Sequence, residues 1–394
     1  MSVIHRSVPG GNGEISLLGF GLMRLPKNSE DSADINYELG CQMVDYALEH
    51  GVTYFDTAWP YHEGQSEVFA GKALVARHPR DSFTLATKCP VWIMKTPEQV
   101  RETFEEQLRK CQVDRFDFYL MHSLNRARFE AAEELGIYDI LQEYKKEGKI
   151  GALGFSFHST VDDLDYIARA HDWDFAQIQL NYLDWTQQNA EGSYNLLTSL
   201  DIPVNIMEPV RGGALANLPT AAADLLTAAD PTASQASWAL RFAATLPNVQ
   251  VVLSGMSTFE QVEDNVATFS DFAPLDAGDK QLLEQVAAAY SSAGAIPCTG
   301  CRYCMDCPSG VDIPRVFAVY NQYHLGEQMP AAYQLGMTVI GMEHGPQYCT
   351  RCETCLSKCP QHIAIPDRME EIAAEQEELF GALHEGNKFF ARRP

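Results

Sequence analysis

The sequence has no long apolar run and little positive charge. No segment of the 394 residues approaches the roughly 20 consecutive apolar residues that a membrane-spanning helix needs. The 29 Lys and Arg residues are outnumbered by 53 Asp and Glu residues, which gives a net charge of −24. Nucleic acids and anionic membranes bind basic surfaces, so we expect neither as a partner. Solubility is the simplest explanation of the acidic balance.

Cysteine is scarce over most of the chain, and the N-terminal residues lack the basic and then apolar pattern of a secretory signal. Only Cys41, Cys89 and Cys111 precede residue 298, and none of them has a second cysteine at the short spacing of a metal-binding motif. A disulfide framework would require a secreted chain in an oxidising compartment. We therefore expect a cytoplasmic, reducing location and metal ligation by the remaining cysteines.

Eight of the eleven cysteines form two short runs that end in Cys-Pro. The first cysteine run is Cys298-x2-Cys301-x2-Cys304-x2-Cys307, and the second is Cys349-x2-Cys352-x2-Cys355-x3-Cys359. The second run has the spacing of bacterial ferredoxins, and the first is one residue shorter before its last cysteine. Zinc is the alternative for a Cys-x2-Cys pair, but two such runs favour two 4Fe–4S clusters.

The first 290 residues alternate short β-branched or aromatic runs with longer amphipathic stretches. The expected strands cover residues 18–22, 53–56, 83–87, 116–121, 151–155, 175–179, 204–207 and 250–253. Helices are expected over 37–50, 98–111 and 137–147, the last ending before Gly148. Eight alternations predict an α/β protein with a parallel (β/α)8 barrel. No G-x-G-x-x-G follows the first strand, which argues against an open dinucleotide-binding sheet.

Composition also predicts how the chain divides. Residues 1–290 would form the barrel, closed by a helix over 281–290, and the small, turn-prone residues 291–297 would form a linker. Residues 298–366 would form a small, mainly helical two-cluster domain with a helix over 314–325. Residues 367–394 would form a helical tail, because Met369, Ile372, Ala373, Leu379 and Phe380 recur at near-helical spacing.

Three neighbouring strands are expected to end in polar residues. Asp56, Lys88 and His122 each close a strand, and Tyr61 lies in the loop after Asp56. The C-terminal ends of barrel strands meet on one face, where barrel enzymes place their active sites. A nearby ammonium lowers the pKa of a tyrosine from about 10, which makes Tyr61 a usable general acid. Asp56 would hold Lys88 charged, and His122 could orient a substrate oxygen.

Residues 15–270 resemble the aldo-keto reductase family. The stretch from Phe55 to Glu67, FDTAWPYHEGQSE, matches the family's Asp-Thr-Ala-x-x-Tyr signature with its trailing Ser-Glu. The resemblance implies that Tyr61 is the proton donor, that Lys88 and Asp56 tune it, and that His122 orients the carbonyl. It also implies hydride transfer between a nicotinamide and a small carbonyl or alcohol substrate.

The resemblance further implies nucleotide-binding residues at the last four strand ends. These are Ser156, Gln179, Asn181 and Tyr182 at the nicotinamide, Glu208, Arg211 and Gly212 along the pyrophosphate, and Ser254, Gly255, Met256, Ser257, Gln261 and Asn265 at the adenosine. Ordinary turn chemistry is the alternative for these loops. Members that select NADPH place basic residues where this chain has Gly255 and Gln261. NADH therefore fits at least as well as NADPH.

The first loops offer candidates for the substrate pocket. Arg126 and Arg128 could meet an anionic substrate, although we expect both to face solvent. Trp59, Trp92, Met94 and Leu124 could form an apolar wall or simply pack the loops.

The stretch IPCTGCRYCMDCP, residues 296–308, resembles the signature of iron–sulfur members of the same family. By analogy with two-cluster ferredoxins, the resemblance implies crossed ligation, in which each run supplies three ligands to one cluster and one to the other. Cys298, Cys301, Cys304 and Cys359 would hold one cluster, and Cys307, Cys349, Cys352 and Cys355 the other. Four ligands from each run is the alternative.

Two functions stay open. The first is a nicotinamide-dependent carbonyl reductase or alcohol dehydrogenase whose clusters exchange electrons or stabilise the fold. The second is an electron-transfer or scaffold protein whose barrel is a docking body and whose four polar residues are a relic. The intact set of four favours the first. Clusters carry single electrons and a nicotinamide transfers a hydride, so coupling the two would need a flavin or a radical-tolerant substrate, and we find no flavin motif. A structural role for the clusters, or a separate redox partner protein, is the alternative.

Overall fold

The computed structural model describes residues 2–7, 13–29, 31–305, 307–325, 333, 336 and 344–386, the last eight of these by their backbone alone. Close contacts between Cα atoms divide the chain into two compact units. The first unit comprises residues 1–210 and 236–280, and the second comprises 211–235 and 281–394. Residues 387–394 of the expected tail lie outside the described residues.

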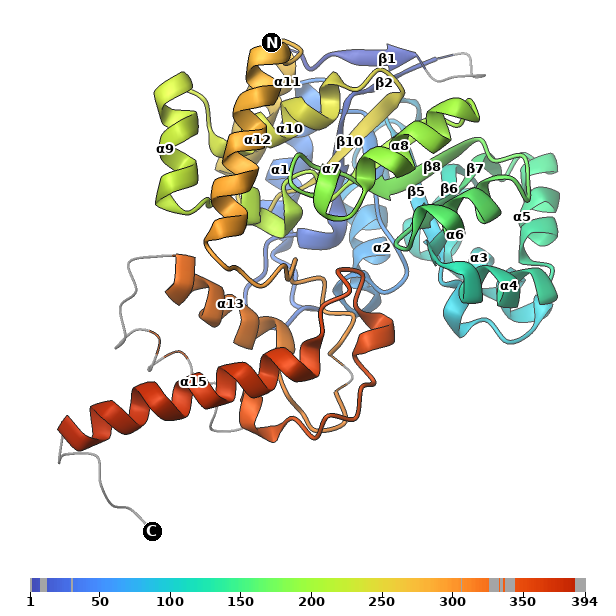
Figure 1. Cartoon of the computed structure of the whole chain (residues 1–394). Coiled ribbons are helices and arrows are strands. Elements are labelled where there is room, and N and C mark those ends of the chain that lie inside the picture. Colours follow the sequence, from blue (N-terminus) through green and yellow to red (C-terminus); the bar gives the residue numbers. More distant parts are fainter. Residues whose placement is uncertain are drawn as a thin grey trace. The chain divides into compact units, whose positions relative to one another are not determined.

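Eight parallel strands form a closed barrel in the first unit, and Figure 1 labels β5 to β8 and β10 among them. Their order around the barrel is β10-β3-β4-β5-β6-β7-β8-β9. They are β3 (Leu18–Gly21), β4 (Tyr54–Asp56), β5 (Thr84–Cys89), β6 (Phe116–Leu124), β7 (Ile150–Phe157), β8 (Phe175–Gln179), β9 (Val204–Met207) and β10 (Val249–Gly255). An antiparallel hairpin of β1 (His5–Ser7) and β2 (Glu14–Ser16) precedes them. All eight predicted strands, and with them the (β/α)8 class, are confirmed, with ends that differ by a few residues.

Helices follow the strands as the alternating pattern predicts. They are α1 (Tyr37–Glu49), α2 (Gln65–Phe69), α3 (Pro97–Cys111), α4 (Arg126–Glu134), α5 (Ile137–Lys146), α6 (Val161–Ala168), α7 (Asp184–Gln187), α8 (Ala190–Ser199), α9 (Thr220–Ala229), α10 (Gln235–Thr245), α11 (Phe259–Ser270), α12 (Ala277–Ser292), α13 (Ile313–Leu325) and α15 (Ile365–Gly386). The Thr96 side chain caps α3 by accepting from the Gln99 N–H, with Pro97 in the first turn. Gly148, with φ of 78°, follows α5 in the left-handed region, as the sequence predicts.

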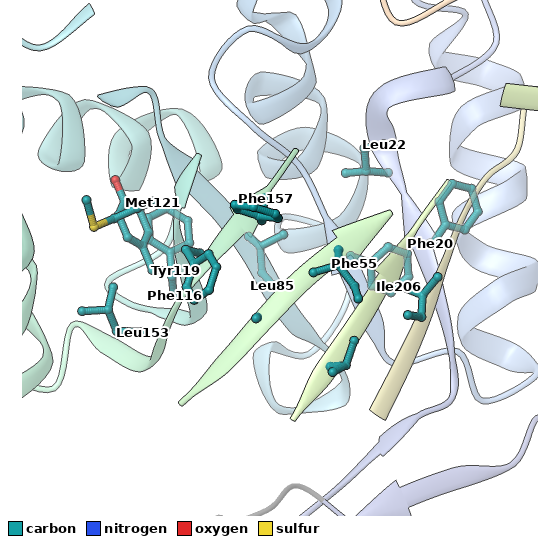
Figure 2. Close-up of a cluster of buried hydrophobic side chains, with 14 of the residues drawn as sticks. Phe20, Leu22, Phe55, Leu85, Phe116, Tyr119, Met121, Leu153, Phe157 and Ile206 are labelled. Atoms are coloured by element: carbon teal, nitrogen blue, oxygen red, sulfur yellow. The ribbon is translucent and has the colours of Figure 1, made fainter. Parts of the chain in front are cut away.

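Alternation along the strands separates two hydrophobic clusters. One packs between the barrel and its helices, and Figure 2 shows members of it such as Phe20, Phe55 and Ile206. The rings of Phe20 and Phe55, from neighbouring strands, stack with centroids 5.7 Å apart. The other cluster fills the barrel and includes Tyr54, Ala86, Phe118, Leu120, Phe175 and Val251.

The same alternation points the polar strand ends inward. Asp56, Lys88 and His122 each stand two residues after a member of the interior cluster. Successive strand residues face opposite sides, so residues two apart share a side. All three side chains therefore enter the barrel at its C-terminal end, where barrel enzymes bind their substrates.

The second unit has a hydrophobic cluster of its own. Val316 and Phe317 of α13 pack with Ile365, Met369 and Ile372 of α15, and cysteines of both runs lie against them. These contacts confirm the predicted helix over 314–325 and the amphipathic start of the tail. The described helices include none that is both long and apolar enough to cross a membrane.

Candidate active site and cluster-binding cysteines

A buried ion pair lies at the centre of the candidate active site. Lys88 is fully buried, and its Nζ donates to Asp56 Oδ1 at 2.5 Å and to the Thr57 carbonyl at 2.7 Å. Burial lowers the pKa of Lys88, and the Asp56 carboxylate counteracts that shift. An isolated ammonium would lose its proton in such surroundings. Burial likewise raises the pKa of Asp56, and Lys88 counteracts that shift, so each partner favours the charged form of the other.

Tyr61 and His122 complete the group. Lys88 Nζ lies 4.9 Å from the centroid of the Tyr61 ring, and the Tyr61 and His122 ring centroids are 5.9 Å apart. Tyr61 keeps 9% of its surface exposed. The structure thus brings together all four residues that the sequence singled out, and Tyr61 is the most exposed of them.

The turn after Tyr61 is strained and pinned. His62 and Glu63 adopt φ of 51° and 54°, which is costly for residues other than glycine. The buried His62 ring donates from Nδ1 to the Ser32 carbonyl at 2.7 Å and accepts the Leu25 N–H at 3.2 Å. Both contacts hold the turn that carries Tyr61. Sequence reasoning missed His62, although its place next to the proton donor was a signal.

His122 is a neutral side chain. Burial lowers its pKa well below the usual value, and the positive charges of Lys88 and Arg128 and the nearby His158 add to the effect. A neutral imidazole can donate one hydrogen bond to a substrate oxygen without adding charge.

The loops beside His122 correct one expectation and bear on another. Arg128 does not simply face solvent: it is half-buried, donates to the Ser123 carbonyl at 2.8 Å and lies 5.3 Å from the Trp92 ring centroid. Arg126 is also half-buried, and its guanidinium is paired with Asp163 at 3.0 Å. Trp92 is 40% exposed, with its ring centroid 5.1 Å from that of His122, so it can wall a substrate pocket. Met94 and Leu124 belong instead to the cluster around the barrel.

The glutamate that ends the sequence signature anchors the strand of Lys88. Glu67 is fully buried and accepts from Thr87 Oγ1 at 2.8 Å and from Gln107 Nε2 at 2.5 Å. Gln107 also donates to the Lys88 carbonyl at 3.0 Å. Lys110 lies 3.6 Å from the other Glu67 oxygen and balances the buried charge. Gln107 was missed, although a glutamine on the apolar face of α3 was a signal.

The expected nicotinamide-binding residues lie at the ends of β7 and β8. Ser156 Oγ accepts the Ser123 N–H at 2.7 Å. Gln179 and Asn181 both donate to Asp184 Oδ2, at 2.7 Å and 2.6 Å. Tyr182 is buried, with its ring edge-on to Phe242 and the centroids 6.3 Å apart. Asp184, which sequence reasoning missed, thus orients two of the four.

The expected adenosine-binding loop is ordered by its own side chains. Asn265 Nδ2 donates to Ser254 Oγ at 2.9 Å, and the Ser257 N–H donates to Gln261 Oε1 at 2.7 Å. Met256 is buried. The structure brings together every residue predicted at this end.

Arg24 is a cation that the sequence did not place beside this loop. A Cβ on Gly255 would lie 3.1 Å from Arg24 Cδ, and Ser257 Oγ donates to the Arg24 carbonyl at 2.7 Å. Arg24 Nη2 lies 3.9 Å from Glu208 Oε1. Its position directly after the first barrel strand was the available signal.

The remaining two predicted nucleotide ligands, Arg211 and Gly212, belong to the second unit. Arg211 is buried, and Gly212 has φ of 65°. A Cβ on Gly212 would lie 2.3 Å from the carbonyl oxygen of Thr299, which follows Cys298. The backbones of Gly212 and Thr299, both in the second unit, therefore pass so close to each other that no side chain fits at position 212.

The cysteines of the second unit line two cavities. The first cluster cavity is lined by Cys298, Cys301, Cys304 and Cys359, together with residues that include Arg302 and Lys358. The second cluster cavity is lined by Cys307, Cys349, Cys352 and Cys355, with Cys304, Glu353 and Lys358 among the others. The first cavity thus carries three cysteines of the first run and the last cysteine of the second run. The second cavity carries three cysteines of the second run with Cys307 of the first run, and Cys304 lines both cavities. The described part of the chain contains no group of three or more His, Cys, Asp or Glu side chains arranged to hold a single metal ion.

The thiols influence one another within these same groups. Burial raises the pKa of Cys304, and the charges of Cys301, Cys298 and Cys359 add to that effect. Burial likewise raises the pKa of Cys355, together with Cys349, Cys307 and Cys352. Thiolates packed in this way repel one another, and iron would offset that repulsion. Eight cysteines over the two cavities, with Cys304 lining both, supply four donors for each of two 4Fe–4S clusters.

Known protein families match both the barrel and the cysteine-rich region of the chain. Residues 17–288 match the Aldo/keto reductase family, and residues 297–365 match the 4Fe-4S dicluster domain. A probable aldo-keto reductase of Glycine max is 31% identical over 52% of this chain and 61% of its own length. The NADH-specific methylglyoxal reductase of Escherichia coli is 25% identical over 72% of this chain and 99% of its own. The solved aldo-keto reductase AKR11C1 of Bacillus halodurans superposes with a TM-score of 0.60 at 26% identity, over 73% of this chain and 97% of its own. The chain belongs to the Aldo/keto reductase family of oxidoreductases and carries a C-terminal 4Fe-4S dicluster domain.

Proposed function

We propose that this chain reduces the carbonyl of a small molecule, or oxidises the corresponding alcohol, with Tyr61 as the proton donor. A nicotinamide, when bound, would supply or accept the hydride. The observation that carries the proposal is the buried Lys88–Asp56 pair beside Tyr61 and His122. Holding an ion pair away from water is costly, and it contributes no clear stability in return. Its retention favours an active enzyme over a relic that serves as a scaffold.

The four residues divide the work on a substrate carbonyl. The neutral His122 would donate a hydrogen bond to the oxygen and orient it. Tyr61 would give its phenolic proton to that oxygen as negative charge develops there. The ammonium of Lys88, held by Asp56, would stabilise the phenolate that remains.

We propose NADH as the preferred nicotinamide and a small aldehyde or ketone as the substrate. Gly255 and Gln261 offer no charge to a 2′-phosphate, and the nearby Arg24 lies close to the Glu208 carboxylate. The relative from Escherichia coli, named an NADH-specific methylglyoxal reductase, supports the same choice and supplies a probe substrate.

Deuterium tracing tests the hydride transfer. We expect NADH that carries deuterium at C4 to deliver it to the carbinol carbon of the product of methylglyoxal, as mass spectrometry of the product would show. Both C4 faces are labelled in separate experiments, and NADPH is run in parallel. Product without deuterium from either face, or no turnover with either nicotinamide across a panel of aldehydes and ketones, would contradict the proposal.

We further propose that the second unit binds two 4Fe–4S clusters by crossed ligation, one in each cluster cavity. Cys307 and Cys359 each line the cavity of the other run, which supports this pairing. The full chain, purified without oxygen, should contain about eight irons and eight sulfides.

A variant with Cys349, Cys352 and Cys355 all changed to serine separates crossed from local ligation. Crossed ligation predicts that this variant keeps one cluster, with about four irons. Adding Cys307→Ser should then leave that cluster intact, whereas adding Cys359→Ser should remove it. Four ligands from each run predict the reverse response to these two additions, as read by iron content and the electron paramagnetic resonance (EPR) spectrum after reduction.

The clusters exchange electrons, we propose, with a redox partner protein. Among the eight cysteines of the two runs, Cys352 alone is exposed, and the exposed Tyr348 and Leu356 are its near neighbours in sequence. Such a rim would let a partner approach the second cavity. The visible absorbance of the clusters, followed during the deuterium assay without oxygen, tests this proposal. The absorbance should stay constant during turnover. Bleaching of the clusters by NADH alone would instead indicate direct electron transfer from the nicotinamide.

A further inference from the structure

One charged residue is common to both cluster cavities. Lys358 lines the first and the second, and no other charged residue among the described lining residues does so. It ends the short helix η8 (Leu356–Lys358), between Cys355 of the second cavity and Cys359 of the first. The chain passes from one cavity to the other at this point, so crossed ligation itself places Lys358 there.

A cation in this position acts on reduction. Each 4Fe–4S cluster with four thiolate ligands is anionic, and reduction adds one more negative charge. A nearby positive charge stabilises the reduced form more than the oxidised form, and the effect falls with distance. Lys358 is half-buried, which weakens screening by water and salt. Its charge therefore favours the reduced form in both cavities.

We propose that Lys358 raises the reduction potentials of both clusters together, a statement that rests on the proposed pair of clusters. Clusters held in two cavities that share Cys304 and Lys358 would repel each other's added electrons. A cation that lines both cavities offsets that repulsion for either cluster. The second unit can then hold two electrons for a redox partner.

The other charged lining residues provide matched controls. Arg302 lines the first cavity and not the second, and Glu353 lines the second and not the first. Both are exposed. Arg302→Gln should lower the potential of one cluster, Glu353→Gln should raise that of the other, and the two variants assign the transitions to their cavities.

The test is an EPR-monitored redox titration of the full chain. In Lys358→Gln both midpoints should move to lower potential, each by a shift worth about threefold to tenfold in the reduction equilibrium, where tenfold is 59 mV for one electron. Lys358→Arg, which keeps the charge, should restore both midpoints. If Lys358→Gln loses iron, Lys358→Met replaces it, because methionine keeps the apolar stem and lacks the charge. Both midpoint potentials should again fall.

The outcomes separate this inference from the function on which it rests. A charge-removing variant that retains both clusters and moves one midpoint, or neither, overturns the role of Lys358. An equal fall of both midpoint potentials in Lys358→Arg would also overturn the role of Lys358, because this variant keeps the positive charge. A native chain with fewer than two clusters refutes the proposed cluster pair instead.

Discussion

Replacing Tyr61 with phenylalanine should lower carbonyl turnover by about 10²- to 10⁴-fold, the usual contribution of a general acid. The change removes the phenolic hydroxyl and keeps the ring that packs beside Lys88 and His122. Lys88 keeps its bonds to Asp56 and to the Thr57 carbonyl, so the barrel and its stability should be retained. The measurement is kcat and kcat/KM with NADH and methylglyoxal, together with iron content and the unfolding midpoint.

Tyr166→Phe is the matched control for this variant. Tyr166 is 43% exposed on α6 and lies over Arg126, away from the four residues of the site. Its loss of a hydroxyl should leave kcat within twofold, on the order of the noise expected for a surface change. Turnover that survives in Tyr61→Phe would show that the proton comes from elsewhere.

Lys88→Met would be a poorer test of the same idea. It would leave the Asp56 carboxylate buried without its partner, and breaking such a pair costs about 3–5 kcal/mol. Lost activity could then reflect lost structure. Tyr61→Phe avoids this ambiguity because it changes a proton and leaves the charges in place.

Periodicity predicted the barrel well because each strand and helix carries its own pattern. The alternation that places Tyr54 inside the barrel also places Asp56 there, so the inward direction of the catalytic candidates follows from the same pattern. The sequence signature around Tyr61 then limited the chemistry. Each of these features lies within a short segment of the chain, so it can be recognised from the sequence without knowing the fold.

Contacts across the barrel closure could not be predicted in this way. Strand β10 pairs with β3, with Gly255 opposite Gly21, and this pairing brings Arg24 against the loop that we expect to bind adenosine. More than 200 residues separate the two segments along the chain, and neither segment's sequence indicates that the other is its neighbour in the fold. Asp184 and Gln107 were missed for a related reason, because each orients other side chains and occurs in no motif of its own.

The chain divides less simply than composition suggests. Small and turn-prone residues pointed to a boundary at 291–297, with a helix over 281–290 closing the barrel. Contacts in the structure instead assign residues 211–235 and 281–290 to the second unit. Gly212 shows why composition cannot detect this. Its neighbour Thr299 lies far along the sequence, and two glycines in a row are typical of many turns.

Changing Gly212 to alanine should remove the cluster of the first cavity and leave about four irons per chain. The new Cβ would lie 2.3 Å from the Thr299 carbonyl oxygen, which is backbone and cannot rotate away. Relief requires that Thr299 move, and Thr299 lies in the loop between Cys298 and Cys301. Ligand positions in a metal site tolerate only a few tenths of an ångström. Iron content and the EPR spectrum of the reduced protein measure the loss.

Gly213→Ala separates this clash from backbone strain. Gly213 has φ of 100°, even less suited to alanine than the 65° of Gly212, yet a Cβ there would have no atom within 4 Å. It should therefore destabilise the loop by about 1 kcal/mol or more while both clusters remain. Equal iron loss in both variants would assign the effect to strain. Full iron in Gly212→Ala would mean that the first cysteine run does not depend on this contact. Loss confined to Gly212→Ala would make the loop after β9 a structural support of the first cluster.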